Sequence, residues 1–185
     1  MPGQRSDARR NYAQILAVAE DEVALHGAEA SLEQIARVAG VGSATVRRHF
    51  PSRRELLEAV FRGRIEDLAE RARDLVSSPD ARAALLEWLG ALTDYAASAR
   101  GMAAALAMDE ATPEHVHACS TKLVHAVDPL LGRAVQAGAV RPDVTTADLV
   151  ALVTGVVLAT ENHVDPTGQA HRLLALAVTG ISPVR

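Results

Sequence analysis

Two helix-start signals enclose a glycine break between residues 31 and 55, and this arrangement constrains the fold more than any other feature of the chain. Ser31-Leu32-Glu33-Gln34 and Ser52-Arg53-Arg54-Glu55 both match the capping box, which satisfies the free N–H groups at a helix N-terminus. Gly40-Val41-Gly42 interrupts the intervening segment, and Pro51 cannot continue a helix. We therefore predict two short helices joined by a tight turn and followed by a longer third helix.

Apolar residues recur at helical spacing along the rest of the chain, and no strand pattern appears. A first helix is predicted from Ser6, as N-cap, to His26, and the long helix that follows Ser52 is predicted to span about 24 residues. Further helices are expected from Pro79 to Ala96, Met102 to Met108, Thr112 to Gly138 with a bend at Pro129, Thr145 or Thr146 to Glu161, and Thr167 to Val178. The fold class is therefore all-α, with about nine helices.

We predict two domains, with the boundary in the long helix. Residues 1–54 form a three-helix unit, and residues 55–185 form a larger helical bundle. Cys119 is the single cysteine, which excludes an internal disulfide and a cysteine-based zinc site and suits a reducing cytoplasm. The longest uncharged stretches, Leu149 to Thr160 and Leu173 to Val184, are too short to span a bilayer. A cytoplasmic protein without membrane association is expected.

Net charge is −4, but the two parts of the chain differ in sign. Residues 1–54 hold 8 basic and 6 acidic side chains, whereas the remainder holds 11 and 17. Four arginines fall within eight positions that contain no acidic residue: Arg47, Arg48, Arg53 and Arg54. Most charge runs are simply solvated faces. Here, however, Val46 and Phe50 form an i,i+4 apolar pair that turns the first two arginines outward, which indicates a local anionic partner.

Two short helices joined by a glycine turn, the second with outward arginines, match a helix-turn-helix, whose second helix enters the DNA major groove. The residues expected to face the groove are Gly42, Ser43, Ala44, Thr45, Arg47 and Arg48. Ser31, His49 and Arg53 are expected to contact phosphates. An arginine can read guanine with two hydrogen bonds. The partner predicted from these residues is a double-stranded DNA operator.

Residues 31–57, SLEQIARVAGVGSATVRRHFPSRRELL, resemble the N-terminal signature of the TetR family of bacterial transcriptional regulators. That family usually has an aromatic residue where Arg47 stands, a serine at Gly42 and a lysine at Arg53. Arg53 keeps the phosphate-binding charge, whereas Arg47 prevents inference of the operator from the family. Residues 95–154, which include AASARGM and GAVRPD, are similar to C-terminal domains of one actinobacterial subgroup.

The resemblance implies a homodimeric repressor that dimerises through its last two helices. The composition of those helices independently favours a dimer, because helices that are apolar on nearly all sides must be buried all round. A central core helix is the alternative. Apolar residues cover more than one face of the first helix (Leu149, Val150, Leu152, Val153, Val156, Val157 and Leu158) and recur on the second (Leu173, Leu174, Leu176 and Val178). The predicted interface residues are Leu149, Val153, Val156, Val157, Leu173 and Leu176.

The resemblance also implies that the C-terminal bundle holds a small molecule, which we expect to be mostly apolar. Five residues are candidates to line the pocket, with ordinary core packing as the alternative for each: Trp88, Tyr95, Met102, Leu106 and His125. A group of metal-binding residue types occurs at Asp109, Glu110, Glu114, His115, His117 and Cys119. His117 points away from the shared face of His115 and Cys119, so we predict a solvated segment and no metal or cofactor.

We therefore interpret the sequence as a ligand-responsive repressor that binds a palindromic operator as a homodimer. The rival interpretation is a small helical interaction module, or an enzyme, that does not bind DNA. The rival leaves the outward arginines between two capping boxes unexplained. It also lacks a catalytic constellation, since Cys119 and His115 have no group to orient them.

Overall fold

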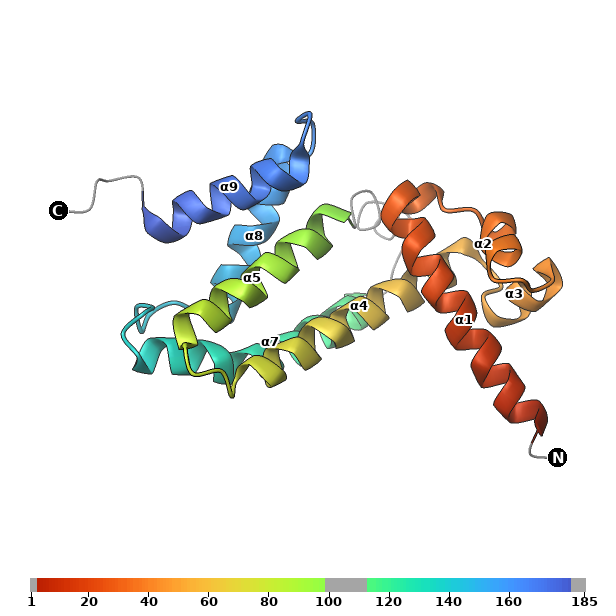
Figure 1. The fold of residues 1–185 in the computed structure, drawn as a ribbon, viewed down its shortest axis with the longest axis horizontal. Helices are drawn as coiled ribbons and strands as arrows, with labels where there is room; N and C mark the ends of the chain where they lie inside the picture. Colours follow the sequence, from red (N-terminus) through yellow and green to blue (C-terminus); the bar gives the residue numbers. More distant parts are fainter. Residues whose placement is uncertain (1–2, 99–112, 181–185) are drawn as a thin grey trace. The chain divides into compact units, whose positions relative to one another are not determined.

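The computed structural model describes residues 3–98 and 113–180, and within these residues it contains eight α-helices and no strand (Figure 1). This confirms the predicted all-α fold. The helix predicted at Met102 to Met108 lies outside the described residues. The elements are α1 Gly3–His26, the 3₁₀ helix η1 Gly27–Glu29, α2 Leu32–Val38, α3 Ser43–His49, α4 Arg53–Leu75, α5 Ala81–Ser98, α7 Pro113–Gln136, α8 Thr146–Thr160 and α9 Pro166–Thr179.

The predicted capping signals begin several of these helices. Ser31 Oγ accepts a hydrogen bond from Gln34 N at 3.3 Å, which caps α2. Thr145 forms a complete capping box with Asp148 at the start of α8: Asp148 N donates to Thr145 Oγ1 at 3.2 Å, and Thr145 N donates to Asp148 Oδ2 at 2.9 Å. Hydrogen bonds from the Thr145 hydroxyl and backbone lower the pKa of the Asp148 carboxyl.

Three helix starts differ from the prediction. Helix α1 begins at Gly3, so Ser6 lies inside the helix and is not its N-cap. Helix α9 begins at Pro166 and is capped by Asp165, whose carboxylate accepts from Gly168 N at 2.9 Å. An aspartate followed by proline at the first helical position provides both a side-chain acceptor and a preset φ, so it outcompetes Thr167. Asp80 caps α5 in the same way, through Ala83 N at 2.9 Å.

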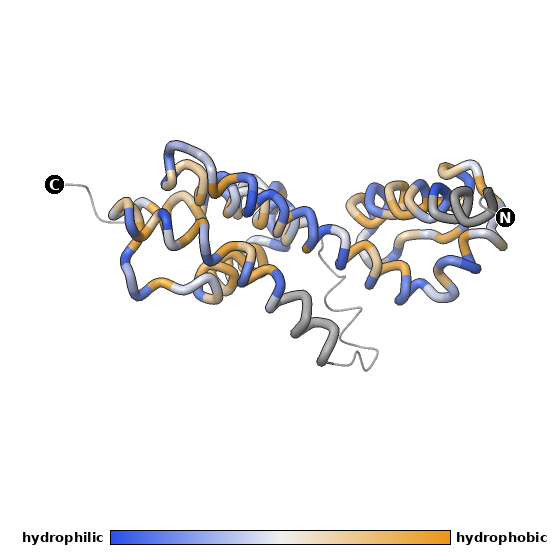
Figure 2. The backbone as a smooth tube through the Cα atoms, turned by 90° about the horizontal axis from the view of Figure 1, so that it is seen from below, coloured by the Kyte–Doolittle hydropathy of each residue, from blue (hydrophilic) through white to orange (hydrophobic). Residues whose placement is uncertain are grey.

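The described residues form two compact units that divide between Gly63 and Arg64, inside α4. Figure 2 shows hydrophobic and hydrophilic stretches alternating along the helices, as amphipathic packing requires. The first unit buries Ile15, Ala19, Val23, Ile35, Val46, Phe50, Leu56 and Val60. The second buries Leu68, Trp88, Leu89, Leu92, Val127, Leu130, Val153, Val157 and Leu174. Each unit therefore has its own core, and α4 contributes residues to both.

Polar contacts tie the helices of the second unit together. The fully buried Trp88 donates from Nε1 to the Leu68 carbonyl oxygen at 3.0 Å, which joins α5 to α4. Thr146, at the start of α8, donates to Asp128 Oδ1 on α7 at 2.7 Å. Helices α8 and α9 pack against each other as a hairpin (Figure 1). In the described part of the chain, no helix combines the length and apolar character needed to cross a membrane.

Candidate nucleic-acid interface

Helices α2 and α3 are joined by a turn that depends on one glycine. Gly40 has φ +64°, a conformation that side-chain-bearing residues rarely adopt. This conformation lets Val41 N donate to the Ala36 carbonyl oxygen at 3.0 Å, which satisfies the end of α2. Gly42, with φ −69° and ψ 143°, then serves as the N-cap residue of α3. The chain therefore changes direction within four residues and starts a second helix.

Packing against α1 fixes the orientation of this helix pair. Val46 and Phe50 on α3 are buried, as their spacing predicted. The Tyr12 ring of α1 packs against Phe50, with the ring centroids 5.2 Å apart. Gln14, also on α1, donates from Nε2 to the Ala39 carbonyl oxygen at 2.8 Å. The helix pair is thus held by apolar contacts at α3 and by a hydrogen bond at the end of α2.

The opposite side of α3 presents the residues predicted to enter the groove. Gly42, Ser43, Ala44, Arg47 and Arg48 are exposed, and Thr45 is half-buried. An α-helix rotates by about 100° per residue, so burial of positions 46 and 50 places positions 44, 47 and 48 toward solvent, whereas Ser43 is exposed at the first position of the helix. The structure therefore gathers this predicted set on one exposed helical surface.

The three residues predicted to contact phosphates have different surroundings. Ser31 is half-buried, and its hydroxyl oxygen is already the cap of α2. His49 is half-buried against Tyr12, with the rings 5.8 Å apart in an edge-on arrangement. Arg53 is exposed at the first position of α4. Of the three, Arg53 has the cation best placed to bind a phosphate.

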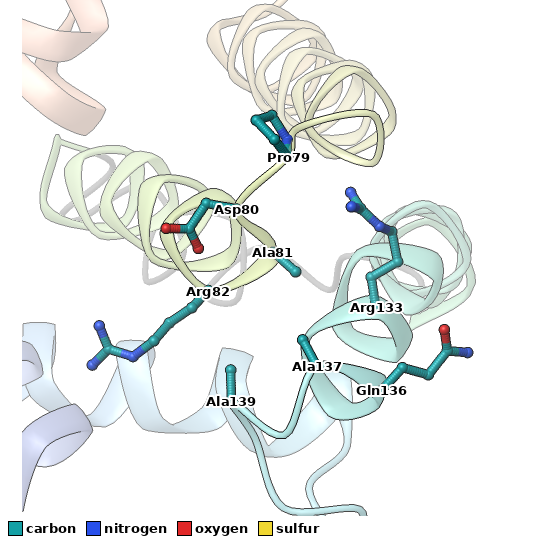
Figure 3. Close-up of a pocket in the computed structure, with 8 residues that line it drawn as sticks. All are labelled: Pro79, Asp80, Ala81, Arg82, Arg133, Gln136, Ala137 and Ala139. Carbon is teal, nitrogen blue, oxygen red and sulfur yellow. The ribbon is translucent and has the colours of Figure 1, made fainter.

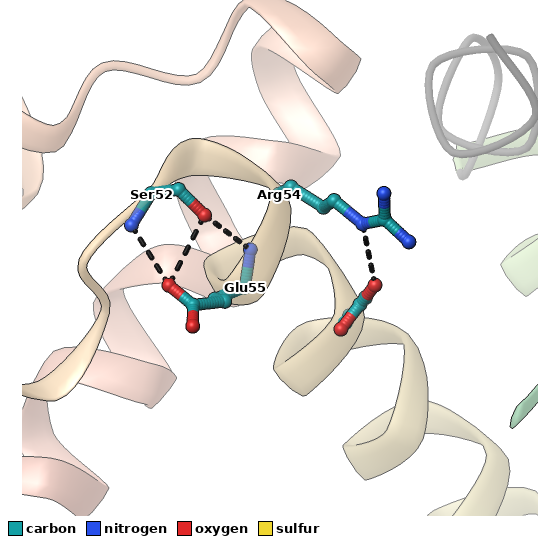
Figure 4. Close-up of polar contacts among 4 residues, drawn as sticks. Ser52, Arg54 and Glu55 are labelled. Carbon is teal, nitrogen blue, oxygen red and sulfur yellow. Dashed lines mark hydrogen bonds and ion pairs between the residues drawn. The ribbon is translucent and has the colours of Figure 1, made fainter. Parts of the chain in front are cut away.

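The second capping box, formed by Ser52 and Glu55 beside Arg54 (Figure 4), sets where α4 begins. Glu55 N donates to Ser52 Oγ at 3.2 Å, and Ser52 N donates to Glu55 Oε2 at 3.0 Å. Arg54 turns along its own helix, where its Nε donates to Glu58 Oε1 at 2.8 Å. The box fixes the start of α4, so the side chain of Arg53 leaves the helix at a defined point.

Two acidic residues for which the sequence suggested no role beyond helix capping lie beside these arginines. Glu33 Oε1 accepts from Arg47 Nη2 at 2.9 Å, and Glu29 Oε2 lies 3.5 Å from Arg53 Nη1. A hydrogen bond from its own backbone N–H, together with the bond from Arg47, lowers the pKa of the Glu33 carboxyl. These pairs join residues 14 and 24 positions apart. Local sequence patterns report only near neighbours, so they gave no signal of these contacts.

The predicted ligand-pocket residues are not gathered around one cavity in the described chain. Trp88 is fully buried with its N–H donated to Leu68, Tyr95 is half-buried, and His125 is exposed. Met102 and Leu106 lie outside the described residues. The described residues do form an open cavity of about 790 Å³ at one end of the second unit (Figure 3). Its lining consists of Pro79, Asp80, Ala81, Arg82, Arg133, Gln136, Ala137 and Ala139, none of which was predicted.

The candidate metal cluster at residues 109–119 falls outside the part of the chain whose side chains are described. Among the side chains that are described, no group of three or more histidine, cysteine, aspartate or glutamate residues is arranged to hold a metal ion.

The predicted dimer residues divide into buried and accessible sets. Val153 and Val157 are 1% and 5% exposed, because they pack into the core of their own unit. A partner subunit therefore cannot reach these two side chains, and the predicted interface needs correction at both positions. Leu149, Val156 and Leu173 are half-buried. The large apolar side chains exposed on the two helices are Leu152, Leu158, Leu176 and Val178.

Two short helices are joined by a turn at a glycine, and the second helix carries exposed arginines. This arrangement defines a helix-turn-helix DNA-binding protein. Residues 15–60 match the family model described as bacterial regulatory proteins of the tetR family, and residues 80–183 match the transcriptional regulator SbtR-like C-terminal domain. The chain belongs to the TetR family of bacterial transcriptional regulators. It is a DNA-binding regulator and not an enzyme, which excludes the rival interpretation.

Solved structures agree with this assignment. A TetR transcriptional regulator from Streptomyces coelicolor is 34% identical, with 94% of this chain and 99% of that chain covered and a TM-score of 0.75. One from Mycobacterium vanbaalenii is 33% identical, with 84% and 93% covered and a TM-score of 0.67. FadR from Bacillus subtilis, solved with stearoyl-CoA, is 20% identical, with 92% and 100% covered and a TM-score of 0.56, and shares the fold. Comparison with curated proteins gave no match.

The turn provides a test of the geometry with a matched control. Gly40→Ala should lower the free energy of unfolding by about 1–2 kcal/mol, because an L-residue is strained at positive φ. No atom lies within 4 Å of the added Cβ, so the loss would come from the backbone alone. Gly42→Ser should cause no such loss, since its φ is ordinary and serine is a good N-cap. Urea denaturation measures both; equal losses would contradict the assigned turn.

Proposed function

We propose that this regulator is a ligand-responsive repressor that binds a palindromic operator as a homodimer. The observation that carries the proposal is the exposed surface of α3, where Arg47 and Arg48 emerge from a helix held in place by Val46 and Phe50. Because the protein acts on chromosomal DNA, its place of action in a bacterium is the cytoplasm. Two copies of α3, one from each subunit, would enter successive major grooves.

Within this interface we assign different roles to the arginines. Arg48 is exposed, and the structure gives it no hydrogen bond or ion pair among the described residues, so its guanidinium is available to read a guanine base. Thr45 lies one helical turn earlier as a second candidate for base contact. Arg53, at the start of α4, contacts a phosphate and so contributes affinity without sequence preference. Gly42, Ser43, Ala44 and the N-terminus of α2 at Ser31 complete the set of residues that we propose to contact DNA.

Dimerisation is supported by the exposed face of α8. Ala151, Gly155 and Ala159 are exposed at intervals of four residues and therefore lie along one face. Small residues at this spacing allow a helix from a second copy to approach closely, and Leu152 and Leu158 flank them as exposed apolar side chains. On α9, Leu176 and Val178 add to the accessible apolar surface. We propose that this surface pairs with its own copy across a two-fold axis.

The effector would act through α4, the helix shared by the two units. In the second unit α4 is held to α5 by the buried hydrogen bond from Trp88. Two exposed ion pairs, Arg71 with Glu87 at 3.0 Å and Lys122 Nζ with Glu66 Oε1 at 3.8 Å, also connect α4 to α5 and α7. A ligand that separates α5 or α7 from α4 would change these contacts and move α4. Reversing operator occupancy from 99:1 to 1:99 requires about 5.5 kcal/mol of preference for the DNA-incompetent state.

We propose a mostly apolar effector that contacts the α5 face bearing Trp88 and Tyr95. The stearoyl-CoA in the structure of B. subtilis FadR shows that a protein of this fold accommodates a ligand with a long apolar chain. Burying such a chain more completely in the DNA-incompetent state can supply the required preference, at about 0.8 kcal/mol per additional CH₂ group buried. From FadR we extend to this protein only the expectation of a long apolar ligand chain, and not a specific head group.

Two arginine variants test the DNA roles. Arg48→Ala should reduce discrimination between an operator duplex, selected in vitro from random DNA, and a scrambled duplex by about tenfold or more. Arg53→Ala should weaken binding to both duplexes alike and reduce the salt slope by about one unit. Fluorescence anisotropy at several salt concentrations measures both effects. If the two variants affect the two duplexes in the same way, the division into base and phosphate contacts is wrong.

The dimer surface is tested by two glutamate substitutions. Leu158→Glu would place two like carboxylates in the proposed interface and should convert the protein to a monomer with reduced operator affinity. Val164→Glu is the control, because Val164 is fully exposed in the turn between α8 and α9. Sedimentation velocity at micromolar concentration distinguishes the states. A wild-type monomer that still binds the operator tightly would contradict both the interface and the two-groove mechanism.

The single tryptophan reports on the effector site. Stearoyl-CoA should change the fluorescence of Trp88 and release operator DNA, whereas CoA without the acyl chain should do neither. Tyr95→Ala should weaken the response, because it removes a side chain from the same face of α5. Release of DNA by stearoyl-CoA with unchanged Trp88 emission and normal binding to Tyr95→Ala would place the pocket elsewhere.

A further inference from the structure

The positive charge of the DNA-contacting unit is unusually small for a protein that binds a polyanion. Residues 1–54 contain 8 basic and 6 acidic side chains. Affinity for DNA of any sequence depends mainly on the number of phosphates that cations neutralise. The arrangement of the acidic residues therefore matters as much as the arrangement of the arginines.

Two of those carboxylates lie against the arginines of the interface. Glu33, in the first turn of α2, bonds Arg47 of α3 at 2.9 Å, with 66% and 62% of the two side chains exposed. Glu29, at the end of η1, lies 3.5 Å from Arg53 of α4, which also donates from Nη2 to the Glu29 carbonyl oxygen at 3.1 Å. Both carboxylates come from the short segment around Ser31 and reach to other elements. Arg54, in contrast, pairs within its own helix.

Stability does not account for these contacts. Ion pairs between exposed side chains are screened by solvent and contribute little to the free energy of unfolding. The same exposure means that a phosphate can replace the carboxylate at little loss. Glu33 also remains ionised below the ordinary range of a glutamate, because its pKa is lowered. It is therefore a negative charge at neutral pH beside the surface that we propose DNA approaches.

We propose that Glu33 and Glu29 are intramolecular competitors of DNA phosphates for Arg47 and Arg53, and that they suppress binding to DNA of non-operator sequence. The inference rests on the DNA-contact roles proposed above. A random duplex offers only phosphates, which must displace the carboxylates. An operator adds base contacts from Arg48, which the structure leaves without a carboxylate partner among the described residues. The two glutamates thus lower the affinity that carries no sequence information on every duplex, so that tight binding requires the base contacts that an operator adds.

The test compares Glu33→Gln with a matched control in the full chain. Asp21→Asn removes one exposed carboxylate from the same unit, at a position with no arginine contact among the described interactions. The probe is a scrambled 30-base-pair duplex, titrated between about 50 and 200 mM salt. Glu33→Gln should bind it roughly fivefold more tightly at the low-salt end, with a salt slope steeper by about one unit. Asp21→Asn should stay within about twofold of wild type.

A double variant shows whether the effect passes through the arginine. Glu33→Gln combined with Arg47→Ala should lose the gain in affinity, because no guanidinium remains to be released. Equal gains for Glu33→Gln and Asp21→Asn, or a gain that persists without Arg47, would overturn the inference. Failure of the wild-type protein to bind any duplex at low salt would instead overturn the DNA-contact roles on which it rests. Circular dichroism and urea denaturation should be unchanged for Glu33→Gln, since the side chain is exposed.

Discussion

Burial of Val46 and Phe50, with Phe50 packed against Tyr12 of α1, is the interaction on which the DNA-binding surface depends. These two side chains fix the rotation of a helix of only seven residues, which has too few backbone hydrogen bonds to be stable alone. A rotation by one residue, about 100°, would turn Arg47 or Thr45, depending on its direction, toward the core and Val46 away from it. Apolar packing on one side of α3 thus determines which polar groups the other side offers to DNA.

The ion pairs on that surface contribute less to the free energy of unfolding than the apolar core beneath it. The buried apolar contacts hold the helices, while the exposed pairs of Arg47 with Glu33 and Arg53 with Glu29 can exchange partners. We expect a surface of this kind to keep its shape when DNA binds. It can therefore change electrostatic partners without reorganising the fold, which suits a regulator that searches among many non-specific sites.

The second unit combines a polar anchor with an accessible apolar surface. The hydrogen bond from Trp88 to Leu68 attaches α5 to the part of α4 that belongs to this unit. Moving α5 relative to α4 would break that bond and leave the indole N–H without a partner in a buried site, which costs free energy. The bond therefore favours one relative position of the two helices. The two faces of helix α8 differ in burial: Val153 and Val157 fill the core, whereas Leu152 and Leu158 remain accessible.

The sequence by itself determined the helical fold, the turn at Gly40, and the outward direction of Arg47 and Arg48, because caps, glycines and apolar spacing act within a few residues. It did not determine which face of α8 is buried, since nearly every residue there is apolar and the helical period leaves no contrast between faces. The starts of α1, α5 and α9 also differ from the prediction, and at α9 two candidates close together in the sequence, Asp165 and Thr167, compete for the cap. The pairing of Glu33 with Arg47 and the burial of Trp88 were decided only by tertiary structure, because each joins residues that are distant along the chain and meet only once the helices have packed.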